Sequence, residues 1–214
     1  MPDPPPFPTV PSNQPPIDLF ANIVTDDLRG GAAYATFLET FRTLQDRVVT
    51  SHPPENVWDD LAERMQEAAD LLEPWWIAEW QRPAGLRTDL PGRGSPLLMP
   101  FVPGEESDGL IRGTVVFRPF HVGGNGAAHG GTLPMLFDDV MGHLSSVGGR
   151  GVARTAYLKV NYRKITPVEV ELQVEATVDR IEGRKRFLVG RLFDDEYLYA
   201  DAEALFVELK PGQP

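Results

Sequence analysis

GGNGAAHGGTLPMLFDDVMG, residues 123–142, is a glycine-rich turn that leads directly into a mostly apolar segment with two adjacent aspartates. Pro134 is tolerated only in the first turn of a helix, so a helix is expected to begin between Gly130 and Leu133. At 100° per residue, this helix gathers its large apolar side chains on one face. That face comprises Leu133, Leu136, Phe137, Val140, Met141 and Leu144. The stretch therefore predicts a central helix that packs against a sheet.

Asp138 lies on a flank of the predicted helix, about 100° or more from the centre of the apolar face. The flank also carries Pro134, Met135 and Gly142, and these apolar neighbours favour a second protein surface over water. Unpaired N–H groups at a helix N-terminus bind anions or polarise carbonyl oxygens. The helix N-terminus would supply oxyanion donors, and the Asp138 carboxylate would supply a base or nucleophile. The sequence thus predicts that both groups reach the same carbonyl carbon. A solvated helix face remains the alternative for Asp138 and Asp139.

Segments with two-residue alternation lie on both sides of this helix and predict strands. The expected strands are residues 97–102 and 109–119 before the helix, and 155–162, 168–179, 184–193 and 196–209 after it. Strict alternation gives one buried and one wet face, which is typical of antiparallel sheets. The later strands leave no room for helices between them, which excludes a parallel Rossmann-type sheet. The predicted fold class is α+β, with an antiparallel sheet wrapped around one helix.

The first 96 residues have a different pattern. Apolar residues at helical spacing predict two amphipathic helices, the first from about residue 24, separated by the prolines of SHPP at 51–54. Three tryptophans follow, and packing is their preferred interpretation. Residues 81–96 are rich in proline, glycine and charge and predict a linker. The expected division is a flexible Pro-rich tail at 1–18, a helical extension and linker at 19–96, and a folded domain at 97–210.

Composition restricts the possible functions. A formal charge of -11 disfavours nucleic acid and anionic membranes as partners. The chain has no cysteine, which excludes disulfides, thiolate nucleophiles and cysteine-ligated zinc. No apolar run approaches the roughly 20 residues needed to cross a bilayer, so a cytoplasmic location is expected. The start of the chain lacks the basic and apolar regions of a signal peptide.

Other catalytic motifs do not fit the sequence. GNGAAH lacks the third glycine of GxGxxG, no GK[ST] follows for a P-loop, and no GxSxG marks a nucleophilic serine. His121, His129 and His143 are spaced by eight and fourteen residues, which fits no compact metal-ligand motif. A structural role is the preferred interpretation of each histidine.

HGGTLPMLFDD, residues 129–139, resembles the signature of hotdog-fold thioesterases of the PaaI-like type and their mammalian acyl-CoA thioesterase relatives. ARTAYLKVNYRKITPVE, residues 153–169, resembles the family strand that follows the helix. The resemblance covers about residues 97–209. It implies a hotdog fold and an acyl-CoA thioester hydrolase of lipid metabolism, with acyl-CoA as substrate. It further implies a homodimer, possibly a dimer of dimers, with sites at the subunit interface, no cofactor and usually no metal.

The resemblance also implies roles for individual residues. Asp138 would be the general base that activates water, or a direct nucleophile. The N–H of Gly130, with Gly131 beside it, would polarise the thioester carbonyl, and His129 would orient the loop. Thr155 matches a residue on the partner subunit's strand that holds water near the acid.

Further candidates follow from the same comparison. Relatives often carry Asn or Gln six residues before HGG, where this chain has Gly123; Asn125, four residues before it, is the substrate-binding candidate. Asp139 is interpreted as a helix-surface or salt-bridge residue. The phosphates of CoA need basic side chains. The candidates, among which the sequence does not choose, are Arg150, Arg154, Arg163, Lys164 and the cluster from Arg184 to Arg186. A solvated hairpin tip is the preferred interpretation of that cluster.

Two other function classes stay open. A hotdog dehydratase or hydratase pairs a histidine with an acid; PFHVGG, residues 119–124, shares a Phe-His pair but not the HFPG-like pattern. A non-catalytic acyl-CoA-binding or sensing protein would use the same pocket without turnover. The two N-terminal helices are predicted to cover the acyl tunnel or to extend the dimer interface.

Overall fold

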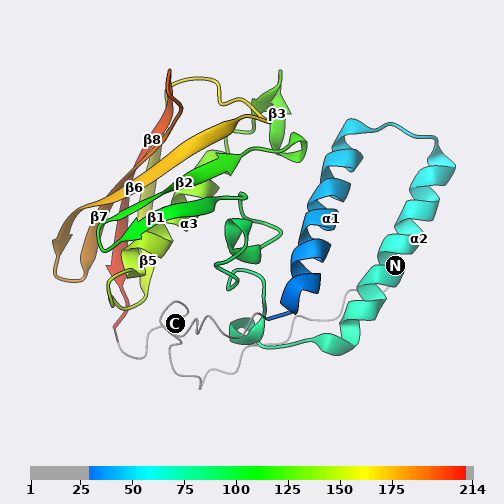
Figure 1. Cartoon of the computed structure of the whole chain (residues 1–214), viewed down its shortest axis with the longest axis horizontal. Helices are drawn as coiled ribbons and strands as arrows, with labels where there is room; N and C mark the ends of the chain where they lie inside the picture. Colours follow the sequence, from blue (N-terminus) through cyan, green and yellow to red (C-terminus); the bar gives the residue numbers. More distant parts are fainter. Residues whose placement is uncertain (1–28, 211–214) are drawn as a thin grey trace.

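The computed structural model describes residues 29–210, so the tail predicted for residues 1–18 lies outside the described part of the chain. Within it, six antiparallel strands wrap around one helix, α3 (Thr132–Ser146) (Figure 1). Across the sheet the strands are β1 (Val102–Ser107), β2 (Leu110–Val116), β6 (Glu171–Glu182), β7 (Lys185–Phe193), β8 (Leu198–Glu208) and β5 (Ala153–Tyr162). A small pair, β3 (Val122–Gly124) and β4 (Ala127–Ala128), precedes α3. The predicted α+β class is confirmed.

The apolar face of α3 forms the centre of the core. All six predicted face residues are at most 1% exposed, and they belong to one cluster with residues of β2, β6, β7 and β8. Gly190 on β7 lets the helix approach closely, because a Cβ there would lie 2.9 Å from a ring carbon of Phe137. Burial of each large apolar side chain is worth about 1.5–3 kcal/mol. The predicted helix and its buried face are confirmed.

Two arginines satisfy carbonyl groups at the C-terminal end of α3. Arg186 is 2% exposed; its Nη1 donates to the carbonyl oxygens of Ser145 (2.6 Å) and Gly151 (2.7 Å), and its Nη2 pairs with Glu208. Arg150 donates from Nε to the Ser145 carbonyl at 3.2 Å. Cations at the C-terminal end of a helix interact favourably with the negative pole of the helix dipole. Arg186 therefore serves the fold, and its prediction as part of a CoA-phosphate cluster is wrong.

The strand predicted at residues 97–102 is also wrong. Only Val102 enters β1, and every residue of β1 is exposed. Pro100 has no N–H to donate to a sheet, and the carbonyl oxygen of Phe101 accepts from the N–H of Gly92 at 2.9 Å. The segment is therefore tied to the loop before it.

The first described part of the chain forms a helical hairpin beside the sheet (Figure 1). The two predicted helices are present as α1 (Gly31–Thr50) and α2 (Glu55–Leu72), although α1 begins at Gly31 and not at about residue 24. None of the residues in α2 is buried. Short 3-10 turns are η1 (Glu73–Trp75), η2 (Glu79–Gln81), η3 (Pro91–Gly94) and η4 (Pro119–His121). Within the described residues, no helix combines the length and the apolar character required to cross a bilayer.

The segment predicted as a linker, residues 81–96, is attached to α1 by several hydrogen bonds. Arg42 on α1 is 3% exposed and donates to the carbonyl oxygens of Pro91 (2.9 Å) and Ser95 (3.2 Å). The hydroxyl of Tyr34 donates to the carbonyl oxygen of Gly94 at 2.6 Å. The segment lacks a periodic pattern, as predicted, but η3 and its flanking loops are held in place through α1.

Candidate functional site

A tight hairpin positions the N-terminal end of α3. Asn125 and Gly126 have φ angles of 51° and 71° between β3 and β4, a conformation that Asn and Gly adopt readily. Gly123 packs so closely that a Cβ there would lie 2.7 Å from the Cα of His129. The N–H of His129 donates to the carbonyl oxygen of His121 at 2.7 Å. Asn125 thus forms the turn, and its proposed contact with substrate stays a prediction.

The loop before α3 presents one N–H group to solvent. Nδ1 of His129 accepts from the N–H of Gly131 at 3.0 Å, and the carbonyl oxygen of His129 accepts from the N–H (2.9 Å) and hydroxyl (2.7 Å) of Thr132. In the described part of the chain, the N–H of Gly130 donates to no acceptor. The Gly131 N–H is thus already engaged by His129, and the role of the Gly130 N–H as an oxyanion donor stays a prediction.

Tyr162, at the end of β5, holds the same loop from the sheet. Its hydroxyl donates to the carbonyl oxygen of Gly130 at 2.8 Å. This hydrogen bond fixes the direction of the Gly130 carbonyl group. Tyr162 is not among the site residues predicted from the sequence. No spacing rule links residues 32 positions apart, and only the sheet brings them together.

Asp138 lies on an exposed flank of α3 beside β5. The hydroxyl of Thr155 donates to its Oδ1 at 2.7 Å. A β-bulge between Thr155 and Tyr157 interrupts the pairing with β8, and bulges re-aim side chains. The resemblance placed Thr155 near the acid but on the partner subunit. Here the contact lies within one chain, because β5 follows α3 directly and packs along this flank.

Asp139 occupies the other flank, where it is covered by η3. Its side chain is 8% exposed and pairs with Arg93, whose φ of 52° is uncommon for a residue other than glycine. Burial raises the pKa of Asp139, although the Arg93 charge opposes that shift. Asp139 and Arg93 line a cavity of about 340 Å³ together with His143 and Glu106. Nε2 of His143 lies 2.9 Å from a carboxylate oxygen of Glu106. The predicted salt-bridge role is confirmed, but the helix-surface position is wrong because η3 covers it.

His121 has a structural environment. Burial lowers its pKa to about 4, so the ring is neutral near pH 7. Its Nδ1 accepts from the N–H of Arg118 at 2.8 Å, which assigns the proton to Nε2, and its ring packs on Phe120 with centroids 4.0 Å apart. Among residues 29–210, no three His, Asp or Glu side chains gather as a potential metal site.

The other basic candidates differ in how far they are engaged. Arg163 pairs with Asp201, and the Lys164 ammonium lies 3.0 Å from the ring centroid of Tyr197. Arg154 is exposed on the outer strand β5, and within residues 29–210 its side chain makes no hydrogen bond or ion pair. Unlike Arg163 and Lys164, Arg154 is therefore not engaged by another described residue.

Comparison with known proteins agrees with this architecture. Residues 125–198 match the Thioesterase superfamily. Mouse acyl-coenzyme A thioesterase THEM4 is 35% identical over 91 residues, covering 42% of this chain and 39% of the mouse protein. Bovine acyl-coenzyme A thioesterase THEM4 is 32% identical over 95 residues, covering 44% and 38%. The chain thus spans about two fifths of the length of these curated relatives.

One solved structure extends the similarity beyond the matched domain. A crystal structure described as a thioesterase superfamily protein aligns with a TM-score of 0.71 and 26% identity, covering 83% of this chain and 96% of that chain. Residues 97–210 make up only about half of the sequence, so the alignment extends into the helical hairpin. Residues 125–198 therefore form a region similar to the thioesterase superfamily, and the sheet wrapped around α3 has the hotdog fold.

Proposed function

We propose that this protein hydrolyses acyl-CoA thioesters to a free acid and CoA. One observation carries the proposal: the Asp138 carboxylate, oriented by Thr155, lies on the helix whose N-terminal loop presents the Gly130 N–H. The names of the mouse and bovine relatives, both acyl-coenzyme A thioesterases, support the choice of substrate.

In the proposed mechanism, the thioester carbonyl oxygen accepts the Gly130 N–H near the positive end of α3. This donor stabilises the negative charge that develops when the carbonyl carbon is attacked. Asp138 accepts a proton from water as the water oxygen attacks the carbon, and the tetrahedral intermediate then expels the CoA thiolate. Thr155 fixes one carboxylate oxygen and leaves the other available for the water. In the second form of the mechanism, Asp138 attacks the carbonyl carbon directly and the CoA thiolate leaves. Water then hydrolyses the resulting anhydride to the free acid and the Asp138 carboxylate.

A homodimer is part of this proposal. Six residues of helix separate Asp138 from Thr132, a rise of about 9 Å, and Gly130 precedes Thr132. A base that acts through one water must lie within about two hydrogen-bond lengths of the carbonyl carbon that the water attacks. The Asp138 carboxylate and the Gly130 N–H of one chain are therefore at the limit of the distance over which both could act on the same carbonyl group. Two antiparallel copies of α3 would instead place Asp138 of one subunit beside Gly130 of the other.

The two edges of the sheet support pairing through β5. The β1 edge is short, contains Pro103 and two glutamates, and has a bulge, which are features that protect an edge. The β5 edge has ten residues and exposes Thr155, Ala156 and Tyr157. A second β5 strand, related by two-fold symmetry, would satisfy that edge and cover the Asp138 flank.

The hydrogen bonds of His129 favour hydrolysis over dehydration or hydration. A neutral imidazole has one basic nitrogen, and Nδ1 of His129 is already the acceptor for the Gly131 N–H. The exposed Asp138 carboxylate is the more available base.

The test is thiol release from short, medium, long and aryl acyl-CoAs, with Asp139→Asn as the matched control for Asp138→Asn. Asp138→Asn is expected to lower kcat about a thousandfold or more, whereas Asp139→Asn at equal folded concentration stays within about threefold of wild type. Equal losses in both variants would remove Asp138 from the mechanism. Wild-type binding of acyl-CoA without any turnover would replace hydrolysis with a binding or sensing function.

A further inference from the structure

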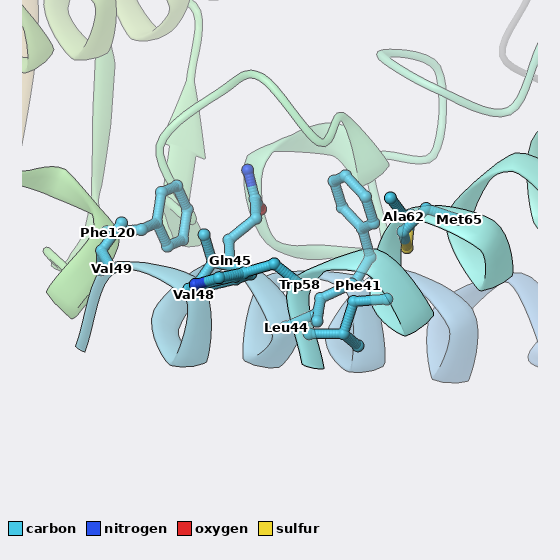
Figure 2. Close-up of a pocket in the computed structure, with 10 residues that line it drawn as sticks. Phe41, Leu44, Gln45, Val48, Val49, Trp58, Ala62, Met65 and Phe120 are labelled. Carbon is cyan, nitrogen blue, oxygen red and sulfur yellow. The ribbon is translucent and has the colours of Figure 1, made fainter. Parts of the chain in front are cut away.

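A groove of about 540 Å³ lies between α1 and α2, outside the hotdog core. Its lining is almost entirely apolar and includes Phe41, Leu44, Val48, Trp58, Met65 and Phe120. Figure 2 shows Phe120 near one end, Phe41 and Met65 towards the other, and the Gln45 amide between them. A concave apolar site of this volume falls in the range of small-molecule pockets. The hairpin therefore has a built cavity that its own side chains do not fill.

The Phe120 end of the groove is joined to the candidate catalytic loop. The ring of Phe120 packs on His121, and the carbonyl oxygen of His121 accepts the N–H of His129, the residue before Gly130. Helix α1 is fixed to this region as well, because Asp46 accepts from the Arg118 guanidinium at 2.7 Å. The Phe120 end of the groove is thus connected to Gly130 through His121 and His129.

Charge on the hairpin restricts what can occupy the groove. Residues 55–72 carry six acidic side chains and one arginine. This helix repels anionic lipid and the phosphates of CoA, and it would also repel an identical α2 from a second copy. A neutral apolar chain meets no such repulsion and gains from removal of groove surface from water.

We infer that the groove between α1 and α2 binds the acyl chain of the substrate, with the thioester at Gly130 and the tail running past Phe120 towards Met65. This inference rests on the proposed function and specifies its substrate class as long, neutral acyl chains. The wall between Val49 and Phe41 spans eight residues of α1, about 12 Å of rise, which sets the length over which added methylenes gain contacts.

The experiment compares two matched variants of α2. Ala62→Phe places a ring in the groove, where Ala62 is part of the lining. Asn56→Phe adds the same ring to the opposite, exposed face of the helix. Thiol release is measured with saturated acyl-CoAs from acetyl to palmitoyl, kept below their micelle concentrations. In parallel, a brominated fatty acid quenches tryptophan fluorescence, and the part of the quenching that is lost in Trp58→Phe reports occupancy beside Trp58, because three other tryptophans are present.

For wild type, kcat/KM is expected to rise with chain length, by up to about fourfold for each buried methylene. Ala62→Phe is expected to lower the ratio of kcat/KM for palmitoyl-CoA to that for acetyl-CoA about tenfold and to weaken the quenching. Asn56→Phe leaves both readouts unchanged. The inference is overturned by hydrolysis without chain-length preference, or by equal effects of the two variants.

Two further results separate this inference from the proposed function. If wild type hydrolyses no acyl-CoA, the proposed function fails, but quenching that Ala62→Phe abolishes still supports a fatty-chain site in the groove. If sedimentation shows that Ala62→Phe dissociates an assembly that Asn56→Phe leaves intact, the groove is a contact between copies and the inference is wrong.

Discussion

The two flanks of α3 carry adjacent aspartates in opposite environments. Asp138 faces β5, is exposed, and accepts a hydrogen bond from the Thr155 hydroxyl. Asp139 faces η3, has a side chain that is 8% exposed, and pairs with Arg93. A step of 100° around the helix separates an exposed carboxylate from one that is mostly buried. Neighbouring residues of the same type can therefore have different surroundings, and the catalytic role of Asp138 belongs to the proposed function.

The covered flank depends on the helical hairpin. Arg42 on α1 binds the carbonyl groups at both ends of η3, and η3 in turn carries Arg93 to Asp139. The N-terminal extension thus contributes to the environment of the central helix through two successive arginines. The open flank has no such cover because β5 ends the sheet there.

The largest effect is expected when the Arg93–Asp139 pair is broken on one side. Arg93→Met leaves a mostly buried carboxylate without its cation. Breaking a buried pair costs 3–5 kcal/mol, and the partial exposure of Arg93 reduces this to about 2–3 kcal/mol of unfolding free energy. Urea unfolding measures the loss, and thiol release at equal folded concentration is expected to change little.

The double variant Arg93→Met with Asp139→Asn is the control for this prediction. Removal of both charges is expected to recover part of the lost stability, because no unpaired charge remains. A double variant that is less stable than Arg93→Met alone would contradict an electrostatic origin of the loss.

A smaller effect is expected on the open flank. Thr155→Val removes the hydroxyl that orients Asp138 and keeps a β-branched side chain on β5. A hydrogen bond to a charged group is worth about 1.5–3 kcal/mol, so kcat/KM is expected to fall by about tenfold or more. The unfolding free energy changes little because Thr155 is exposed. Thr155→Ser retains the hydroxyl and is expected to restore most of the activity; failure to do so would make Thr155 a packing residue.

Local patterns in the sequence were sufficient for the elements that surround the core. The period of α3 and the alternation of β5 through β8 depend on which neighbours share a face, and the structure places these elements close to the predicted ranges. The strand predicted at residues 97–102 is wrong because apolar content alone does not specify a strand and Pro100 prevents regular pairing.

Long-range partners could not be predicted from the same patterns. Glu175 falls on the predicted wet face of its strand, yet it is 8% exposed because Arg112 and Arg191 on the two neighbouring strands pair with it. Arg93 reaches Asp139 across 46 positions of sequence. The family resemblance identified Asp138, Gly130 and Thr155 as candidates, but only the fold shows that Thr155 contacts Asp138 of its own chain.

The pH dependence of stability gives the finest test of the contrast between covered and open carboxylates. Burial raises the pKa of Asp139 above its ordinary 3.8, so the native state holds more protons than the unfolded chain just above that value. Its contribution to stability therefore falls as pH rises through this window. Asp194 accepts from the Tyr199 hydroxyl and from two backbone N–H groups, which lower its pKa. Its contribution is present above the unfolded pKa and is lost as pH falls.

Urea unfolding of wild type, Asp139→Asn and Asp194→Asn from about pH 3.5 to 7 compares the two cases. The advantage of wild type over Asp139→Asn is expected to shrink as pH rises, whereas its advantage over Asp194→Asn grows. Opposite slopes would show that removal from water dominates at Asp139 even beside Arg93. Parallel slopes would mean that the Arg93 charge outweighs burial, and the two flanks of α3 would then differ only in the access that water has to them.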